Sequence, residues 1–383
     1  MLKDTFFSAR DHILKNTNKH IIIIADPIDQ QLAGIYYFTI NLVKHLIRID
    51  KKNKYTIIKL NKKKIDDTIE HISLKNSIRF LRNDPIRKFH TLPKLIKKLN
   101  PDIVIEPAHF GPFNLPSHIK RVTCIHDLTP LLFPKYHPFG SVVAHKLFLK
   151  TVITKADLII TNSVHTQTDI HEFSKDSLGK TIVAHLGKRE TFKNRKSRDV
   201  LDHYKVSEPY FFTLGTIEPR KNLTTLLEAY NIFRRSYKKK VKLVIAGEFG
   251  WKSTNFYKRF LKHQFKEDII LLGYANRQDL PYLYSHAEAF IYPSLYEGFG
   301  LSVLEAMACG TACIISNTSS LPEVGSGAAL YFNPNSPLEL KEQMISLFED
   351  KLQKDLQLKA VHQAANFSWE KFTCIITNQL NQL

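Results

Sequence analysis

The chain contains little cysteine. Its 383 residues include four cysteines, which show neither C-x-x-C pairing nor the histidine spacing typical of zinc sites. A chain of this length with 43% hydrophobic residues can build two or more domains with their own cores, without disulfides or structural metal. We therefore expect reduced, buried cytosolic thiols at these positions: Cys124, Cys309, Cys313 and Cys374.

Long apolar runs are also absent. A run such as 21–25 (IIIIA) is far shorter than the roughly 18–20 residues that span a bilayer. The first twenty residues lack the continuous apolar core of a signal peptide. The sequence therefore predicts a cytoplasmic protein with no membrane-spanning helix.

Acidic residues are scarce relative to basic ones. There are 36 Asp and Glu against 55 Lys and Arg, which gives a net charge of +19 and a pI near 9.6. Lysine clusters occur at 51–54, 62–64 and 238–240. Nucleic-acid binding would require cations interleaved with aromatics, or a known module, and neither is present. The charge fits a sugar-phosphate donor or an anionic membrane surface; solvated loops without a dedicated partner are the alternative.

Short apolar strands alternate with helices along the whole chain. This alternation predicts an α/β fold with parallel sheets covered on both faces. Two such series are separated by the polar stretch 188–205, which predicts two doubly wound, Rossmann-like domains facing across a cleft. The expected domains are 1–190 and 208–366, joined by a linker at 191–207. Predicted strands are 20–25, 55–60, 102–106, 121–125, 157–161, 210–214, 241–246, 269–272, 289–292 and 312–315, and predicted helices include 35–49, 222–235 and 301–308.

Two loops at predicted strand ends have features of phosphate sites. Ligands of such sheets bind beyond the carboxyl ends of the strands. In the loop within 25–42, Gly34 can let the backbone approach a phosphate, and a simple turn is the alternative. In GTIEPRKNL (215–223), Arg220 and Lys221 precede a helix N-terminus and suit a diphosphate. A surface pair on an exposed loop is the alternative there.

A third loop carries two glutamates in the stretch EGFGLSVLE (297–305). Glu297 lies on the predicted loop, where it can reach a ligand. Glu305 lies on a helix that is apolar nearly all round and therefore buried. Its carboxylate can accept hydrogen bonds from two vicinal hydroxyls, as on a ribose. The alternative is an internal salt bridge with Arg220 or Lys221.

One histidine also follows a predicted strand. His126 lies in CIHDLTPLLFP (124–134), directly before an aspartate. A His-Asp step at a strand end can orient or stabilise a reacting centre. A purely structural role is the alternative.

Together these stretches resemble the retaining glycosyltransferases of family 4, a large GT-B group of nucleotide-sugar-dependent enzymes. The resemblance covers most of the chain. It is most specific in 215–223, in 316–324 (SNTSSLPEV) and in 271–311, where Glu297 and Glu305 frame seven residues as in the family's signature. The stretches 124–134 and 157–170 (DLIITNSVHTQTDI) are similar to its mannosyltransferase-like branch. The last segment, 367–383, resembles the family's final helix, which crosses back to the first domain.

The resemblance implies a role for each candidate residue. Glu305 would hold the ribose hydroxyls of a nucleotide sugar, and Glu297 the hydroxyls of the transferred sugar. Arg220 and Lys221 would neutralise the leaving diphosphate. His126 would lie beside the anomeric carbon, its carbonyl or ring assisting the sugar cation and the incoming hydroxyl. The other implied donor-binding residues lie in the glycine loops and supply backbone donors: Gly34, Gly215, Thr216, Phe299, Gly300 and Leu301.

Two positions depart from the family pattern. Thr216 stands where many members have an arginine, so we expect Arg220 to supply that cation. The first-domain loop is one glycine short and lacks the family's arginine, and Tyr36 could shape an acceptor pocket instead. No D-x-D motif occurs, which agrees with transfer that needs no metal and no cofactor.

The expected function is transfer of a hexose, with mannose from GDP-mannose as the leading donor, onto a glycan of the cell surface. A UDP-sugar donor is one alternative, and a basic membrane-peripheral binding protein with an inactive GT-B core is another. An epimerase would not need both the RKN element (220–222) and EGFGLSVLE (297–305), and a phosphorylase would use inorganic phosphate in place of a sugar acceptor. Residues 142–155 and the apolar side chains near the N-terminus could lie on the inner face of a membrane, or face the core instead. These N-terminal apolar residues are Leu2, Phe6, Phe7, Ile13 and Leu14.

Overall fold

The computed structural model describes residues 18–30, 33–75, 86–112, 114–207, 209–349 and 351–383. The apolar N-terminal side chains, for which a membrane surface and the core were both considered, lie outside these ranges. Within them, no helix is long and apolar enough to cross a bilayer.

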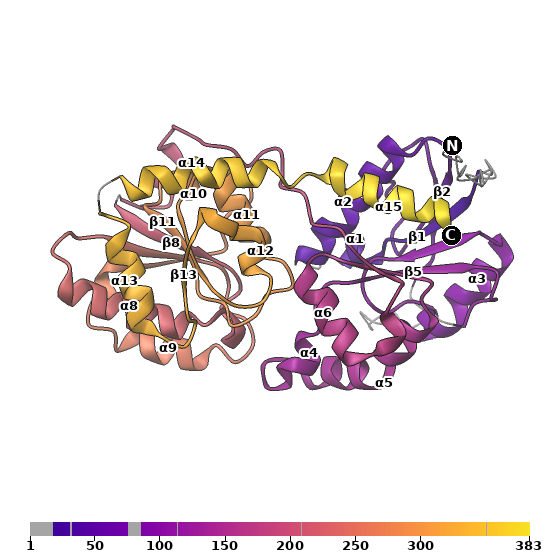
Figure 1. The fold of residues 1–383 in the computed structure, drawn as a ribbon, viewed down its shortest axis with the longest axis horizontal. Coiled ribbons are helices and arrows are strands. Elements are labelled where there is room, and N and C mark those ends of the chain that lie inside the picture. The colour runs from indigo at the N-terminus through magenta and orange to yellow at the C-terminus, as the bar shows by residue number, and fades with distance from the viewer. Residues whose placement is uncertain (1–17, 31–32, 76–85, 113, 208, 350) are drawn as a thin grey trace, which may run out of the picture.

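The first half of the chain folds into a seven-stranded parallel sheet (Figure 1). The strand order is β3-β2-β1-β4-β5-β6-β7, and β1 pairs with both β2 and β4. The strands are β1 His20–Ile24, β2 Lys54–Lys59, β3 Glu70–Ser73, β4 Ile103–Glu106, β5 Lys120–Ile125, β6 Leu158–Thr161 and β7 Thr181–Val183. The helices are α1 Asp26–Gln30, α2 Ala33–Ile49, η1 Arg87–Thr91, α3 Leu92–Leu99, α4 Thr129–Leu132, η2 Pro134–Tyr136, α5 Phe139–Lys155, α6 Val164–Phe173 and η3 Lys175–Ser177.

The second half builds a six-stranded parallel sheet of order β10-β9-β8-β11-β12-β13. Its strands are β8 Tyr210–Leu214, β9 Lys242–Ala246, β10 Ile269–Gly273, β11 Ala289–Tyr292, β12 Cys313–Ser316 and β13 Leu330–Phe332. Its helices are α7 Asp199–His203, η4 Pro219–Lys221, α8 Leu223–Ser236, α9 Thr254–Leu261, η5 Lys266–Asp268, α10 Leu280–Ser285, α11 Leu301–Ala308, α12 Leu321–Gly325, η6 Ser326–Ala328, α13 Pro337–Ser346, α14 Leu352–Ala365 and α15 Trp369–Gln382.

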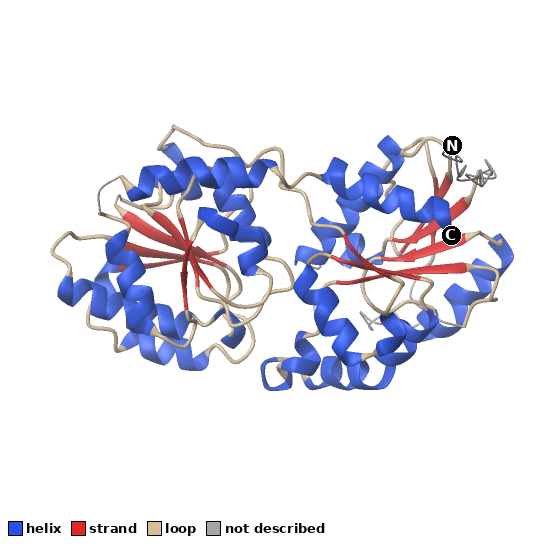
Figure 2. Cartoon of the chain, viewed as in Figure 1, coloured by secondary structure: helices blue, strands red, loops and turns tan. Residues whose placement is uncertain are grey.

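Helices cover both faces of both sheets, as the sequence predicted (Figure 2). The central strands are buried because they are continuous runs of branched and aromatic residues; β1 and β11 are the clearest cases. All ten predicted strands are confirmed to within two residues. Three further strands, β3, β7 and β13, were not predicted. They are three or four residues long and lie at sheet edges, mostly half-buried, so their apolar runs are too short to predict a strand.

The chain passes between the two halves twice, at neighbouring points. Lys188 N donates to Phe367 O (3.4 Å), so the outgoing and returning segments lie side by side. After the second crossing, α15 packs on α2 of the first half, where Trp369 meets Tyr37 edge-on with ring centroids 5.7 Å apart (Figure 1). Segment 191–207, expected as a linker, contains α7, which packs against α10 of the second half.

Gly187 marks the tightest point of this crossing, and its substitution tests it. A Cβ at residue 187 would lie 2.2 Å from the backbone nitrogen of Trp369. We predict that Gly187→Ala lowers the free energy of unfolding by about 1–3 kcal/mol, because the two segments must separate to admit the methyl group. Thermal unfolding measures this. Gly327→Ala is the control, since a Cβ there meets nothing within 4 Å; equal Tm values for the two variants would contradict the prediction.

Candidate active site

Three loops at the carboxyl ends of β8, β11 and β12 meet in the second domain. Leu295 N, after β11, donates to Arg220 O, after β8 (2.9 Å). Glu297 N donates to Ser319 Oγ, after β12 (2.9 Å). The loops therefore fix one another at the edge of the sheet where ligands of doubly wound domains bind.

A short turn aims Arg220 and Lys221 into this junction. Both residues belong to η4, which ends at Asn222 in the left-handed conformation (φ 54°), one that asparagine tolerates well. The Asn222 Nδ2 donates to the carbonyls of Pro293 (3.1 Å) and Pro334 (2.7 Å), which locks the turn. The two cationic side chains are only 17% and 13% exposed. The alternative of a surface pair on an exposed loop was therefore wrong.

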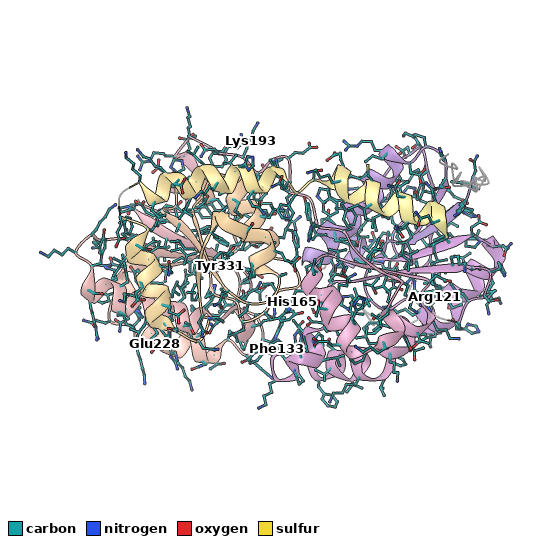
Figure 3. All side chains as sticks on the ribbon, viewed as in Figure 1. Arg121, Phe133, His165, Lys193, Glu228 and Tyr331 are labelled. Carbon is teal, nitrogen blue, oxygen red and sulfur yellow. The ribbon has the colours of Figure 1, made fainter. Side chains whose placement is uncertain are left out.

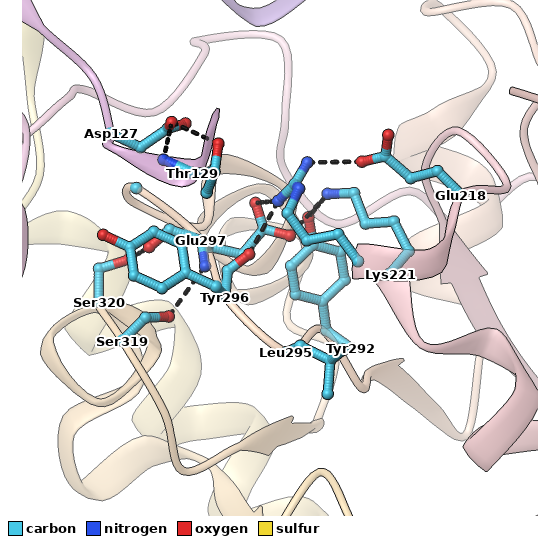
Figure 4. A network of polar contacts seen from close by, with 12 residues as sticks. Asp127, Thr129, Glu218, Lys221, Tyr292, Leu295, Tyr296, Glu297, Ser319 and Ser320 are labelled. Atoms are coloured by element: carbon cyan, nitrogen blue, oxygen red, sulfur yellow. Dashed lines mark hydrogen bonds and ion pairs between the residues drawn. The ribbon is translucent and has the colours of Figure 1, made fainter. Parts of the chain in front are cut away.

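The carboxylate of Glu297 lies between the two cations (Figure 4). Its Oε2 is 2.9 Å from Arg220 Nη1, and its Oε1 is 2.7 Å from Lys221 Nζ. Lys221 Nζ also donates to Tyr292 Oη (2.5 Å). Burial alone would raise the pKa of Glu297, but the charges of Arg220 and Lys221 lower it to about 2. Glu297 is therefore the anion that offsets these cations when no ligand is bound.

Two further carboxylates face Arg220; the sequence interpretation gave Glu218 no role and considered Asp127 only as the neighbour of His126. Glu218 Oε1 is 2.7 Å from Arg220 Nη2, and its side chain is 3% exposed. Asp127 approaches from the first domain, held in place by the backbone N–H (2.9 Å) and Oγ1 (2.6 Å) of Thr129, and lies beside the cluster in Figure 4. Glu218 is two residues from Arg220 in the sequence, and this short spacing could have predicted the ion pair between them. No local pattern predicts that Asp127 faces Arg220, because the two residues come from different domains.

The glycines of the EGFG loop allow this close approach. A Cβ at Gly298 would lie 2.1 Å from His126 O, so only glycine lets the loop reach the first domain. Gly300 begins α11 with a φ of 105°. The ring of Phe299 packs against His185 and Phe367, so this residue can offer a ligand only its backbone. Among the described residues no acceptor pairs with the amides of Phe299, Gly300 or Leu301, which leaves three donors for an anion.

The structure places His126 against this loop, as expected from its position after β5. Its Nε2 lies 2.8 Å from Pro107 O, and because a carbonyl only accepts, Nε2 carries the proton and Nδ1 has the lone pair. Burial lowers the pKa of His126, which keeps the ring neutral. Its carbonyl contacts Gly298 and accepts from Thr166 Oγ1 (3.3 Å). In this arrangement the carbonyl is thus covered by the second domain.

A chain of buried histidines holds the His126 backbone. The His126 N–H donates to His109 Nε2 (2.9 Å), so His109 must carry its proton on Nδ1. That nitrogen lies 3.3 Å from His145 Nε2, and His145 Nδ1 lies 2.8 Å from Ser141 O. Burial lowers the pKa of His109 to about 3 and also lowers that of His145. All three rings are therefore neutral, each with a defined tautomer, and act here as a positioning network.

Glu305 is buried on α11, and its partner is not one of the predicted cations. Arg189, two residues after the first domain crossing, places its Nε 3.0 Å from Glu305 Oε1, and the Arg189 guanidinium lies 3.9 Å above the Tyr37 ring. The two atoms form an ion pair without the alignment of a hydrogen bond, and neither atom has a hydrogen bond to any other described residue. Burial raises the pKa of Glu305 to about 7, against the opposing charge of Arg189. The expected alternative, a salt bridge to Arg220 or Lys221, is wrong because those cations pair with Glu297.

The remaining predicted residues have different surroundings. Gly215 adopts a φ of 151°, and a Cβ built there would lie 3.3 Å from Lys221 Cε. Thr216, beside it, is exposed. Gly34 lies inside the first turn of α2, not in a loop before the helix as predicted, and has open space around it. The Tyr36 ring lies 5.5 Å from the guanidinium of Arg277 in the second domain.

Loops of the two domains also bond to each other around the site. Ser163 Oγ donates to Gly298 O (2.7 Å). The Glu323 carboxylate accepts from Val164 N (2.8 Å) and His165 N (2.7 Å) at the N-terminus of α6. Glu323 lies in SNTSSLPEV, a stretch to which the sequence interpretation gave no individual role. These bonds hold the facing loops of the two domains in contact.

Comparison with known proteins agrees with this geometry. A sequence profile of the glycosyl transferases group 1 matches residues 195–366, which include the three loops of the second domain. O-antigen chain mannosyltransferase B of Escherichia coli is 30% identical over 376 residues, covering 92% of this chain and 97% of its own. The chain belongs to the glycosyl transferases group 1 family. O-antigen chain mannosyltransferase RfbU of Salmonella typhimurium is 27% identical over 241 residues, or 63% of each chain.

Solved glycosyltransferases share the fold of this family member over nearly its whole length. A glycosyltransferase from Rickettsia africae has a TM-score of 0.71 at 18% identity and covers 95% of this chain and 98% of its own. Anabaena Alr3699/HepE, solved with UDP-glucose, has a TM-score of 0.73 at 14% identity and covers 96% of this chain and 100% of its own. The predicted GT-B architecture is confirmed.

Removing the central carboxylate of this glycosyltransferase tests whether its cations form an anion site. We predict that Glu297→Gln lowers the free energy of unfolding by about 3 kcal/mol, because two shielded cations lose their counter-ion. Inorganic diphosphate should restore more of the Tm in the variant than it adds to the wild type.

The control is Glu342→Gln, whose carboxylate is 64% exposed. It should change neither the Tm nor the response to diphosphate. A Glu297→Gln protein that responds to diphosphate no more than the wild type would contradict an anion site at Arg220 and Lys221.

Proposed function

We propose that this glycosyltransferase transfers mannose from GDP-mannose to a lipid-linked glycan of the O-antigen type. The observation that carries the donor part is the pairing of Arg220 and Lys221 around Glu297 at the strand ends. Two cations and three open amides there match the charge and size of a sugar diphosphate. When the donor binds, Glu297 can turn from the cations to the sugar hydroxyls while the diphosphate replaces it.

The carboxylate of Glu305 supports a donor bound at the same strand ends. Glu305 Oε1 and Arg189 Nε are buried and lack hydrogen-bond partners among the described residues, so this corner has unused polar capacity. Ribose hydroxyls bound to Glu305 would satisfy it. The nucleoside would then lie near α11, with the diphosphate at the start of that helix. Gly215 and Thr216 would line the path of the phosphates.

The reaction proposed is metal-independent transfer with retention, as in family 4. Arg220 and Lys221 would supply the positive charge that stabilises the leaving diphosphate. The proposed place of the sugar is between Glu297 and the His126 loop, with Asp127 beside it. His126 would stay neutral and support the anomeric centre by its position. An NMR assignment of the product anomer tests retention, and activity after exhaustive chelation tests the metal requirement.

The relatives support the choice of sugar and acceptor. Those named above are described as O-antigen chain mannosyltransferases, one of them similar over almost the whole chain. The structures solved with UDP or UDP-glucose share the fold at 14–15% identity and support a nucleotide-sugar donor only in outline. O-antigen glycans are built on lipid carriers, so we place the enzyme at the inner face of the membrane, as a peripheral protein with no nucleic-acid partner.

A donor screen tests the proposal. Incubation with GDP-mannose, UDP-glucose and UDP-galactose, with lipid extract as acceptor, should release GDP and not UDP. Release of UDP alone would show that the donor is a UDP-sugar and would overturn the assignment of GDP-mannose. No turnover with any donor would favour the alternative of an inactive GT-B binding protein.

The role of Glu305 has its own test in calorimetry. We predict that Glu305→Ala weakens GDP-mannose binding about 100-fold, because two hydrogen bonds to a charged group are lost, worth about 3 kcal/mol together. Glu342→Ala, on an exposed surface, should bind as the wild type does. Unchanged binding by Glu305→Ala would contradict the ribose assignment.

The raised pKa of Glu305 predicts a pH dependence. Only the ionised carboxylate accepts two hydroxyls, so GDP-mannose affinity should rise as the pH rises through about 7, where Glu305 loses its proton. Arg189→Met removes a charge that favours the ionised form, and should move the midpoint to higher pH. Arg195→Met, which has no contact with Glu305, is the matched control; an Arg189→Met midpoint equal to that of this control would contradict the account.

A further inference from the structure

Two segments on opposite sides of the domain cleft contain cations but no acidic residue. Residues 129–155 contain four lysines, and residues 249–266 contain four lysines and one arginine. The first segment covers α4, η2 and α5 of the first domain, and the second covers α9 with the loop before it. We call them together the basic rim. Acid-free stretches of this length on both sides of one cleft form a local excess of positive charge.

The basic rim also exposes large apolar side chains. Seven of the sixteen exposed large hydrophobic residues among the described ranges lie in it. Phe139 is 83% exposed and Leu147 is 64% exposed, values that a side chain packed on its own domain does not reach. The seven are Leu132, Phe139, Leu147, Phe249, Trp251, Tyr257 and Leu261.

The two segments touch and form one continuous edge. Trp251 Nε1 donates to Tyr136 O, and Lys252 Nζ donates to Lys135 O, so the loop before α9 lies on η2. In Figure 1 α4, α5 and α9 all lie along the lower edge of the molecule. Phe133, labelled in Figure 3, lies on this edge where the two domains meet.

The exposed residues of α5 share one face of the helix. Phe139, Lys146, Leu147 and Lys150 are spaced by seven, one and three residues, which places them along one stripe. The opposite face packs into the first domain through residues that include His145 and Leu149. The core alternative for the segment 142–155 is thus confirmed for one face, and the other face is exposed.

Few acidic groups from neighbouring elements offset this charge. Glu228 of α8 lies 3.7 Å from Arg259, and Asp176 accepts a hydrogen bond from Thr154 at the end of α5. No ion pair is formed by Lys135, Lys146, Lys150, Lys252 or Lys258 in the part of the chain that the structure describes. The rim thus keeps most of its cations available to a partner.

We propose that the basic rim docks on a bilayer containing anionic phospholipid. Lysines among exposed Phe, Trp, Tyr and Leu side chains match the headgroup region, where cations meet phosphates and aromatic rings enter the interface. An acidic protein or a nucleic acid would also attract the cations. A bilayer is favoured because exposed apolar side chains lie among the lysines of both segments, as the headgroup region requires. This inference extends the acceptor part of the proposed function by naming the surface that meets the membrane.

Docking by this edge would bring the membrane to the active site. The Phe133 ring lies 5.5 Å from the Tyr296 ring, and Tyr296 is next to Glu297. A sugar on a lipid carrier in the docked bilayer would therefore enter the cleft at Phe133. The two domains would contact the same bilayer, so docking also fixes the cleft relative to the membrane.

Sedimentation with vesicles tests the docking surface without any sugar substrate. The full chain should bind vesicles of phosphatidylethanolamine with about one quarter phosphatidylglycerol, and bind phosphatidylcholine vesicles weakly. The double variant Phe139→Ser, Leu147→Ser and the double variant Lys146→Glu, Lys258→Glu should each reduce binding to the anionic vesicles about ten-fold or more.

The matched control lies on α14, on the opposite edge in Figure 1. Leu358→Ser, Lys354→Glu changes one exposed apolar and one exposed basic residue there and should leave vesicle binding unchanged. If the serine variant binds anionic vesicles as the wild type does while the glutamate variant does not bind, the attraction is purely electrostatic and the proposed docking of apolar side chains is wrong. Equal binding by all variants overturns the proposal. GDP-mannose calorimetry on the same variants should be unchanged, which keeps this outcome separate from failure of the proposed function.

Discussion

The ion cluster of Glu297 with Arg220 and Lys221 is the interaction on which the site depends. It joins the loops after β8 and β11, and Ser319 extends it to the loop after β12. Shielded cations at a helix start are unfavourable without an anion. Glu297 fills that need, and in the proposed function a diphosphate takes over its place. Under that proposal, the contacts that stabilise the fold also prepare the donor site.

The facing domain meets this cluster through backbone and small side chains. Gly298 lies against the His126 carbonyl, and Ser163 bonds to the Gly298 carbonyl. Neutral histidines hold the backbone of His126 from behind, so the wall opposite the cluster is rigid and carries little charge. Asp127 is the exception, and it faces Arg220. Charge at this junction is thus concentrated on a few groups: Glu297, Glu218, Asp127, Arg220 and Lys221.

The sequence predicted what depends on local pattern. Strand runs, the start and end of α11, and the presence of two parallel sheets follow from apolar periodicity and glycine punctuation. Glu297, Arg220 and Lys221 could be grouped because all follow strands of one parallel sheet, whose carboxyl ends share an edge. Gly34 was placed in a loop because glycine usually punctuates a helix, yet α2 begins before it.

Long-range partners could not be predicted in this way. Arg189 pairs with Glu305 across 116 positions of sequence, and nothing in its own segment, KRETFK, marks it among many cations. His109 and His145 support His126 from two other elements. The basic rim needs tertiary structure for the same reason, because its two segments meet only through η2 and the loop before α9. Exposure, which defines the rim, is a property of the folded chain.

A crystal structure of the enzyme with GDP tests the central claim most directly. The account predicts diphosphate oxygens within hydrogen-bond distance of Arg220, Lys221 and the amides at the start of α11, with both ribose hydroxyls on Glu305 and Glu297 released from at least one cation. A nucleotide bound elsewhere, or one bound here with Glu297 still between the two cations and Glu305 still facing Arg189 alone, would contradict it.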